Sequence, residues 1–516
     1  MISDQQKNNW SQKIINLKTD LIYFEKTPMR SGQVIQDEAE FFGYRFNTEN
    51  DYHPNSTFEL EENSVIYLDF GEHLVGDFQF DVDFIGDNVG GPVRFKIVFG
   101  EIPAEIEEDI EAYSGKLSRA WFQDEIVTLE FLPQTVTFSR RFAFQFVKII
   151  LLAKSFDYQV VIKDIQCECT TSADLDIEKY LIPGLDKELK EIDIVALRTL
   201  RNTMQETFID GPKRDKRLWL GDFPLMSQTN NLTFKNPTIA KKCFYLFASQ
   251  LMQDGRIPAC IYRRPKIKGG TEYIVDFAIL FGSYLFDYAE ETGDWETVKD
   301  LWKVAYSQVE IIINQLDEKG LYINSDNYWI FVDWNPELEK QAAINAIIIY
   351  SLNKICAIAD KFNYKNEKAN LESIISKMKE AAVDKFYDSK NKIFFSGDKK
   401  QISWASQVWM ILAEVVDNET VKSILSRMIN DDYFVKPVSP YLYHYALKAL
   451  FKYDFRTEAI DIIKDYWGAM VRKGASTFWE VYKSDDPKFS PYDNYLLNSF
   501  CHSWSCTPAY FFRKYL

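Results

Sequence analysis

The pattern of apolar and polar positions changes near residue 172. Before that point, short runs of alternating or β-branched residues recur, with glycine-containing turns between them. Alternation with a period of two residues and closely spaced turns is typical of antiparallel β-structure. We therefore predict an antiparallel β-sandwich over residues 31–172, with strands that include 64–70, 77–82, 93–99, 125–131 and 146–152. Residues 1–30 form a polar lead-in without a predicted element.

After about residue 173 the apolar residues recur with the period of an α-helix. The expected helices are 185–206, 236–251, 274–291, 295–315, 337–362, 366–385, 401–414, 418–430, 440–452, 456–470 and 495–513. Segment 342–359 is apolar nearly all round, which indicates an inner helix, whereas 366–386 is charged on one face, as an outer helix is. This alternation predicts an (α/α)6 barrel over residues 173–516. The lack of a repeat of fixed length argues against a regular solenoid.

Charge and composition narrow the classes of partner. The chain has 60 Lys and Arg against 76 Asp and Glu, a net charge of −16. This balance argues against a nucleic-acid-binding surface, because phosphate groups are bound by clustered Lys and Arg. No stretch approaches the ~18 consecutive apolar residues of a membrane span, and the polar N-terminus has no signal pattern. We expect no nucleic-acid or membrane partner and a cytoplasmic location, and we leave a homodimer open.

Cysteine and histidine usage gives no sign of a metal site. The seven Cys are scattered and form no CxxC pair, as expected of reduced thiols in a cytosolic protein. The four His form neither an HExxH motif nor a cluster with Cys. We therefore expect neither a structural nor a catalytic zinc site.

The densest group of reactive side chains lies in residues 210–223, which read DGPKRDKRLWLGDF. Gly and Pro disfavour a helix, so the segment is predicted to be a loop. Opposite charges within one loop hold carboxylates in a fixed geometry, and the alternative is a salt-bridged surface turn. Trp219, between Arg217 and Asp222, argues against the surface turn, because a large aromatic residue gains little there.

Three later segments add candidate residues. In 474–480 (GASTFWE), Glu480 follows two aromatic residues after a turn of small residues. Segment 498–504 (NSFCHSW) contains His502, which by default would be a core histidine. Segment 328–336 (YWIFVDWNP) is an aromatic-rich loop that leads into the apolar inner helix. Aromatic residues followed by a carboxylate suit a site that holds a sugar, and an exposed Glu is the alternative.

These segments together resemble the bacterial α-L-rhamnosidases of glycoside hydrolase family 78, over roughly residues 60–516. The acid-rich loop is similar to the family's signature loop, and the other matching segments are Thr292–Asp294, Asp333–Trp334, Thr477–Glu480 and Asn498–His502. The resemblance implies a β-sandwich followed by an (α/α)6 barrel. It also implies a glycosidase that releases terminal α-L-rhamnose from small glycosides or oligosaccharides with inversion.

Carried over residue by residue, the resemblance implies that Asp215 is the general acid and Glu480 the general base. The substrate-binding residues that it implies are Asp210, Arg214, Trp219, Asp222, Asp333, Trp334, Trp479 and His502. Inverting hydrolysis needs one protonated carboxyl group and one carboxylate, ~6.5–9.5 Å apart. We therefore expect a carbohydrate substrate and neither a cofactor nor a metal.

Two positions depart from the family pattern. Asp215 stands where the family usually has Glu, and Gly211 stands where it usually has Cys. These differences leave open a different (α/α)6 glycosidase specificity or a sugar-binding relative without catalysis. A glycoside phosphorylase is the other enzyme class considered, but a carboxylate at Glu480 would repel the phosphate.

Overall fold

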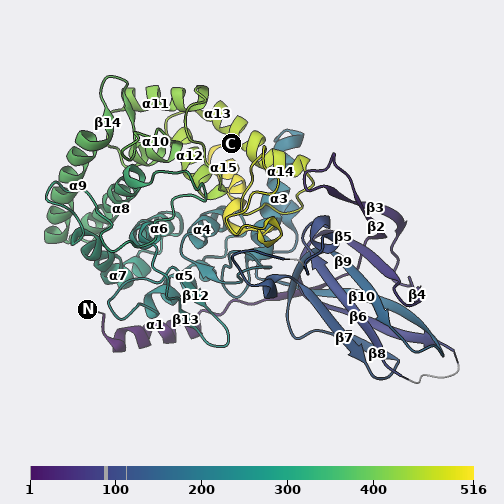
Figure 1. Cartoon of the computed structure of the whole chain (residues 1–516). Helices are drawn as coiled ribbons and strands as arrows, with labels where there is room; N and C mark the ends of the chain where they lie inside the picture. The colour runs from purple at the N-terminus through teal and green to yellow at the C-terminus, as the bar shows by residue number, and fades with distance from the viewer. Residues whose placement is uncertain (1, 87–90, 112) are drawn as a thin grey trace.

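The computed structural model describes residues 2–86, 91–111 and 113–516, as a strand-rich N-terminal domain beside a larger helical domain (Figure 1). The strands are β1 Ile22–Lys26, β2 Arg30–Gln36, β3 Tyr44–Asp51, β4 Phe58–Leu60, β5 Val65–Ile85, β6 Val93–Gly100, β7 Asp124–Leu129, β8 Gln134–Thr137, β9 Phe142–Ala153 and β10 Gln159–Thr171. Their pairing is antiparallel and continuous, with the main order β1-β10-β5-β9-β6-β7. The side branches join β2 and β8 to β5, β3 to β2, and β4 to β10.

Strand β5 links the two halves of this β-domain. The expected strands 64–70 and 77–82 are one strand of 21 residues, so the prediction of two separate strands was wrong. The pairing of β5 with β9 shifts in register between Asp69 and Leu74. Gly71, which lies in this irregular stretch, adopts a φ of +77°. A bulge of this kind bends a strand without ending it. The inward residues of β5, such as Leu68 and Phe80, are fully buried in the β-domain core.

The helical domain contains α3 Lys187–Thr203, α4 Phe223–Leu232, α5 Pro237–Ser249, α6 Val275–Thr292, α7 Trp295–Ile313, α8 Gln341–Lys361, α9 Lys365–Phe386, α10 Trp404–Leu412, α11 Asn418–Asn430, α12 Pro440–Lys452, α13 Arg456–Ile463, α14 Ala469–Arg472 and α15 Pro508–Tyr515. Helices α4, α6, α8, α10 and α12 contact one another in turn, and the C-terminal segment closes the ring. The helices that alternate with them in the chain lie outside. This arrangement confirms the six-hairpin barrel.

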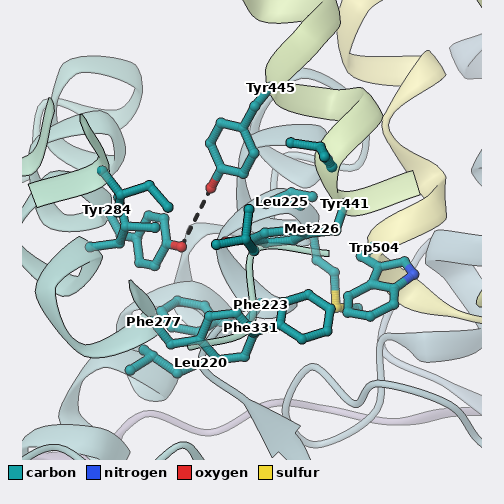
Figure 2. Packing of buried hydrophobic residues seen from close by; sticks show 14 of the residues in the cluster. Leu220, Phe223, Leu225, Met226, Phe277, Tyr284, Phe331, Tyr441, Tyr445 and Trp504 are labelled. Atoms are coloured by element: carbon teal, nitrogen blue, oxygen red, sulfur yellow. Dashed lines mark hydrogen bonds between the residues drawn. The ribbon is translucent and has the colours of Figure 1, made fainter. Parts of the chain in front are cut away.

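Aromatic side chains fill the centre of the inner ring (Figure 2). Tyr284 of α6 and Tyr445 of α12 approach each other there, with their hydroxyl oxygens 3.4 Å apart. Among the described residues, α8 is the one helix that is long and apolar enough to cross a membrane by length and composition alone. Its apolar stretch is 78% buried within the fold, as expected for an inner helix.

Two features of the helical domain differ from the prediction. Helix α4 falls in a segment with no predicted helix, because its polar residues Ser227, Gln228, Thr229 and Asn230 face the interior and hide the apolar period. Residues 495–513 do not form one helix. They form the 3₁₀ turns Tyr495–Leu497 and Ser503–Cys506 and then α15, because backbone groups between them bond to other segments of the chain.

The N-terminal lead-in contains helix α1, Asp4–Asn16, which packs along α5 of the helical domain (Figure 1). Trp10 of α1 is 1% exposed, and its indole N–H donates to Asp300 of α7 over 3.1 Å. The chain then crosses to the β-domain, where β1 pairs with β10. The lead-in therefore joins both domains.

Candidate active site

A cavity of about 270 Å³ lies where the acid-rich loop meets the inner helices and the β-domain. Pockets for drug-sized ligands begin at about 300 Å³, so this cavity suits a single small polar molecule. Its lining comprises Leu117, Trp121, Asp210, Arg214, Asp215, Arg217, Trp219, Asp222, Glu272, Ile274, Phe277, Trp329, Phe331, Trp334, Glu480, Tyr492, His502 and Trp504. Eight of the ten predicted site residues are therefore together.

A larger groove of about 760 Å³ lies elsewhere on the helical domain, with Trp404, Tyr443 and Tyr466 in its wall. It is bordered by helices α11 to α13 and is distinct from the cavity that contains Asp215 and Glu480. We take the smaller cavity as the candidate site, because buried carboxyl groups with perturbed pKa values converge there.

The acid-rich loop is closed by its own first residue. The Asp210 carboxylate accepts the backbone N–H groups of Asp215 over 3.1 Å and Arg217 over 3.0 Å. The backbone of Asp210 also donates to the carbonyl of Arg217 over 2.9 Å. Gly211 is required by this closure, because a Cβ there would overlap the Arg214 carbonyl oxygen and the Ser499 hydroxyl. The Cys of the family pattern does not fit this loop.

A second segment brings Glu480 to the loop. The backbone N–H of Glu480 donates to the Ser499 carbonyl over 2.9 Å, and the Ser499 N–H donates to Glu480 Oε2 over 3.1 Å. The Ser499 hydroxyl donates to the Arg214 carbonyl over 2.8 Å. Ser499 thus connects Arg214 of the loop to Glu480. The backbone groups of Ser499 that make these bonds are not available for a helix.

One guanidinium contacts both predicted catalytic carboxylates. Arg214 Nη2 donates to Glu480 Oε2 over 2.8 Å, and Arg214 Nη1 donates to Asp215 Oδ1 over 3.0 Å. Tyr492 stacks against this guanidinium at 4.1 Å from its ring centroid. Arg214 thus contacts a residue 266 positions away in the chain and fixes the position of Glu480 relative to Asp215.

Glu480 is arranged as a buried carboxylate. Its side chain is 2% exposed. Burial by itself would raise its pKa, but the Arg214 charge, together with hydrogen bonds from the Tyr492 hydroxyl (2.5 Å) and the Ser499 N–H, holds the pKa below its usual value. Glu480 is consequently ionised at neutral pH and can accept a proton.

The pKa of Asp222, at the start of α4, is shifted in the opposite direction. Burial, with the Asp210 charge as the next cause, raises it well above its usual value. Burial also lowers the pKa of His502 to about 4, so its ring is neutral. His502 Nδ1 makes no hydrogen bond within the described part of the chain, and it lies 3.5 Å from Asp222 Oδ1. Both groups line the cavity.

The pKa of Asp210 is raised to about 7, first by burial and then by the Asp215 charge. Since both Asp210 oxygens already accept loop N–H groups, this residue holds the loop as well as lining the cavity.

Aromatic residues form the walls and floor of the cavity. Trp219 belongs to the short strand β11, Leu218–Trp219, which pairs with β12, Cys260–Tyr262. Trp334 stands with its ring 5.7 Å from that of Tyr492. Phe277, Phe331 and Trp504 form the floor and continue into the barrel core (Figure 2).

Two predicted substrate-binding residues lie outside the cavity. Asp333 is 2% exposed, and its carboxylate accepts the backbone N–H groups of Val438 and Ser439, each over 2.9 Å, which anchors the start of α12. Trp479 is turned away from its neighbour Glu480 and packs on Phe41 of the β-domain, with ring centroids 5.8 Å apart. The structure therefore does not bring these two residues into the cavity with the other predicted site residues.

Several cavity residues were missed by the sequence reasoning. They are Leu117, Trp121, Arg217, Glu272, Trp329 and Tyr492, together with the floor residues. Arg217 lies inside the recognised loop and Trp329 inside the recognised aromatic segment, so both could have been named. Leu117 and Trp121 belong to the β-domain, and no local pattern distinguishes them.

The Tyr492 hydroxyl helps to hold down the pKa of Glu480. In Tyr492→Phe the ring stays stacked on Arg214, but Glu480 loses a hydrogen bond that stabilises its ionised form, so its pKa rises. We expect the acidic limb of the pH profile of kcat/KM to move up by about one pH unit. The measurement is kcat/KM from pH 3 to 8 on an aryl glycoside. An unchanged acidic limb would show that Glu480 does not control it.

In residues 2–86, 91–111 and 113–516, no group of three or more His, Cys, Asp and Glu side chains is placed to hold a metal ion.

The two domains match family models separately. Residues 28–169 match the glycosyl hydrolase family 78 α-rhamnosidase N-terminal domain, and residues 184–516 match the bacterial α-L-rhamnosidase six-hairpin glycosidase domain. A comparison with curated protein sequences found no match.

Solved structures give the same result. A rhamnosidase from Klebsiella oxytoca with rhamnose bound is 34% identical, with a TM-score of 0.94 over 98% of both chains. The family 78 rhamnosidase of Bacillus sp. GL1 is 18% identical with a TM-score of 0.75, over 92% of this chain and 50% of that one. The Streptomyces avermitilis α-L-rhamnosidase complexed with L-rhamnose is 15% identical with a TM-score of 0.64, over 94% and 44%. The last two likenesses concern the fold alone.

Proposed function

Since the chain belongs to glycosyl hydrolase family 78, the α-rhamnosidases, we propose that it releases terminal α-L-rhamnose in one inverting step. Asp215 is the general acid and Glu480 the general base. The observation that carries this proposal is the Arg214 bridge, which holds one carboxylate on either side of its guanidinium in one cavity. The substrates are small glycosides or oligosaccharides whose terminal rhamnose fits the 270 Å³ cavity.

Both carboxyl groups contact one guanidinium and line the same cavity, so they can act on one bound sugar. In inverting glycosidases such a pair leaves room for a water molecule beside the sugar. Glu480, which is ionised, accepts a proton from this water as it attacks the anomeric carbon. Asp215 donates its proton to the glycosidic oxygen on the other side of the ring.

Two cations hold the side chain of the proposed acid. Asp215 contacts Arg214 at 3.0 Å and Arg217 at 3.4 Å, and 13% of its side chain is exposed toward the cavity that it lines. A general acid must lie within hydrogen-bond reach of the oxygen that it protonates, and these contacts fix the carboxyl group in one position.

The remaining polar groups bind the sugar. Asp222 and His502, which lie 3.5 Å apart in the cavity lining, contact hydroxyl groups of the sugar. Trp219 and Trp334 enclose the ring. Leu117 and Trp121 of the β-domain stand on the same side of the cavity as Arg217, whose guanidinium is 5.9 Å from the Trp121 ring centroid, so they face the leaving group.

The test is the anomeric form of the first product. The protein is mixed with p-nitrophenyl α-L-rhamnoside in an NMR tube, and the anomeric proton is followed before mutarotation. We expect β-L-rhamnose to appear first. If α-L-rhamnose appears first, the inverting mechanism is contradicted, but the assignment as a glycosidase stands.

A parallel panel of other aryl glycosides tests the sugar. Faster turnover of another glycoside than of the rhamnoside would show that the enzyme is specific for a different sugar. No turnover of any glycoside, with binding of free rhamnose retained, would favour a sugar-binding protein without catalysis.

A further inference from the structure

Two glutamates of the β-domain reach the back of the acid-rich loop. Glu101 follows β6, and Glu105 lies in the short helix α2, Pro103–Glu107. Both side chains are buried, with exposures of 0% and 4%. Between them and the loop lies the ammonium of Lys213, which is 5% exposed. None of the three lines the catalytic cavity described above.

The Lys213 ammonium is fully engaged. It donates to Glu105 Oε1 and to the carbonyl oxygen of Asn498, and it contacts the carbonyl oxygen of Leu496 at 3.2 Å. Glu101 Oε2 is 3.4 Å away. A Lys ammonium has three protons and needs this number of acceptors. The neighbouring Arg214 adds a parallel bond from its Nε to the Leu497 carbonyl over 3.0 Å, so the acid-rich loop and residues 496–498 are fastened together.

Glu101 extends the connection on the other side. Its Oε2 accepts the backbone N–H of Phe500 over 2.6 Å, one residue after the Ser499 that bonds to Glu480. Its Oε1 is 2.9 Å from His73 Nε2. The Asn202 amide donates to the His73 carbonyl over 2.7 Å and lies 2.9 Å from Nδ1, so it also donates to Nδ1. His73 Nε2 then carries the proton and donates it to Glu101.

We propose that Glu105 and Glu101 are positioning residues for catalysis and that Lys213 transmits their hold to Asp215, two residues further along the loop. The inference rests on the proposed function, because it takes Asp215 as the acid. In this proposal the β-domain holds the acid-rich loop, and with it Asp215, through the contacts of Glu101 and Glu105 with Lys213.

The chemistry of the cluster supports positioning. A buried ion pair adds little net stability over an apolar replacement, but it fixes one geometry, and loss of one partner leaves an unpaired buried charge. The acid must lie within hydrogen-bond reach of the glycosidic oxygen. A mutation far from the reacting atoms that displaces a catalytic group by ~1 Å can lower the rate about a hundredfold.

The test separates positioning from stability by comparing two leaving groups. The ratio of kcat on p-nitrophenyl α-L-rhamnoside to kcat on methyl α-L-rhamnoside does not depend on the fraction of folded enzyme. A misplaced acid raises this ratio, because methoxide needs the proton far more than p-nitrophenolate does. We expect Lys213→Met to raise the ratio about tenfold.

The double variant Lys213→Met with Glu105→Gln guards against misfolding. It removes both charges of the closest pair, so we expect it to melt at a higher temperature than Lys213→Met and still to show the raised ratio. A ratio at the wild-type value in the double variant would overturn the inference.

Glu72→Gln is the matched control. Glu72 of β5 also forms a contact between the domains, 3.0 Å from Arg201 of α3, but it contacts neither catalytic segment. We expect a lower melting temperature and an unchanged ratio. A ratio raised equally in Glu72→Gln would show a general effect of the domain contact and overturn the inference. If Asp215→Asn itself leaves the ratio unchanged, the assignment of the acid fails, which is a separate result.

Discussion

Glu480→Gln is expected to lower kcat on p-nitrophenyl α-L-rhamnoside by about a thousandfold, within the range typical of a lost general base. The amide keeps the size of the side chain and an oxygen for the Ser499 N–H, but it cannot accept a proton from water. Because Glu480 is ionised through the Arg214 bridge, this loss should persist across the neutral pH range. The measurement is kcat at saturating substrate, with binding of free rhamnose followed by calorimetry.

The matched control is Glu291→Gln. Glu291 is also largely buried, where it accepts from Asn231 over 2.9 Å, and it lies on α6 away from the cavity lining. We expect this variant to keep kcat near the wild-type value. If the Glu480→Gln variant binds rhamnose and keeps near-normal turnover, Glu480 is not the general base.

Asp215→Asn is expected to have an effect that depends on the leaving group. For methyl α-L-rhamnoside, kcat should fall by about a thousandfold or more, because the departing alkoxide must be protonated as the bond breaks. For p-nitrophenyl α-L-rhamnoside the fall should be much smaller, since p-nitrophenolate is a stable anion. The measurement is kcat on both substrates for the wild-type protein and the variant.

Asp222→Asn tests the rival assignment. Burial raises the pKa of Asp222 well above its usual value, which makes this cavity carboxyl a rival candidate for the acid. Its place at the start of α4, 3.2 Å from the Ser503 hydroxyl, instead suits a contact to a sugar hydroxyl. We expect Asp222→Asn to raise KM and to affect both leaving groups alike. A leaving-group dependence in Asp222→Asn and none in Asp215→Asn would exchange the two roles.

The fold was largely predictable because its elements follow local periods. Strands of the β-domain and the alternation of inner and outer helices were recognised from periods of 2 and 3.6 residues. The failures have specific causes. Helix α4 faces the core with polar side chains. Residues 495–513 do not form a single helix, because the backbone N–H groups of Ser499 and Phe500 bond to Glu480 and Glu101.

The candidate site was predictable where it lies in a compact motif. The acid-rich loop supplied Asp210, Arg214, Asp215, Trp219 and Asp222, all of which line the cavity. Two of the predicted residues do not line the cavity, although each is adjacent in the chain to a residue that does. Asp333 and Trp479 are adjacent to Trp334 and Glu480, but Asp333 bonds to the start of α12 and Trp479 packs on Phe41.

The sequence by itself determined the order of the two domains, the helical hairpins and the chemical types of the reacting groups, because periodicity and motif spacing are local properties. Only the tertiary structure decided which carboxyl groups share a cavity, which are ionised and which residues hold them. Glu480 and Arg214 are 266 positions apart, and the protonation of Glu480 and Asp222 depends on burial and on charges from other segments. Those quantities are set by distances in space that no local pattern encodes.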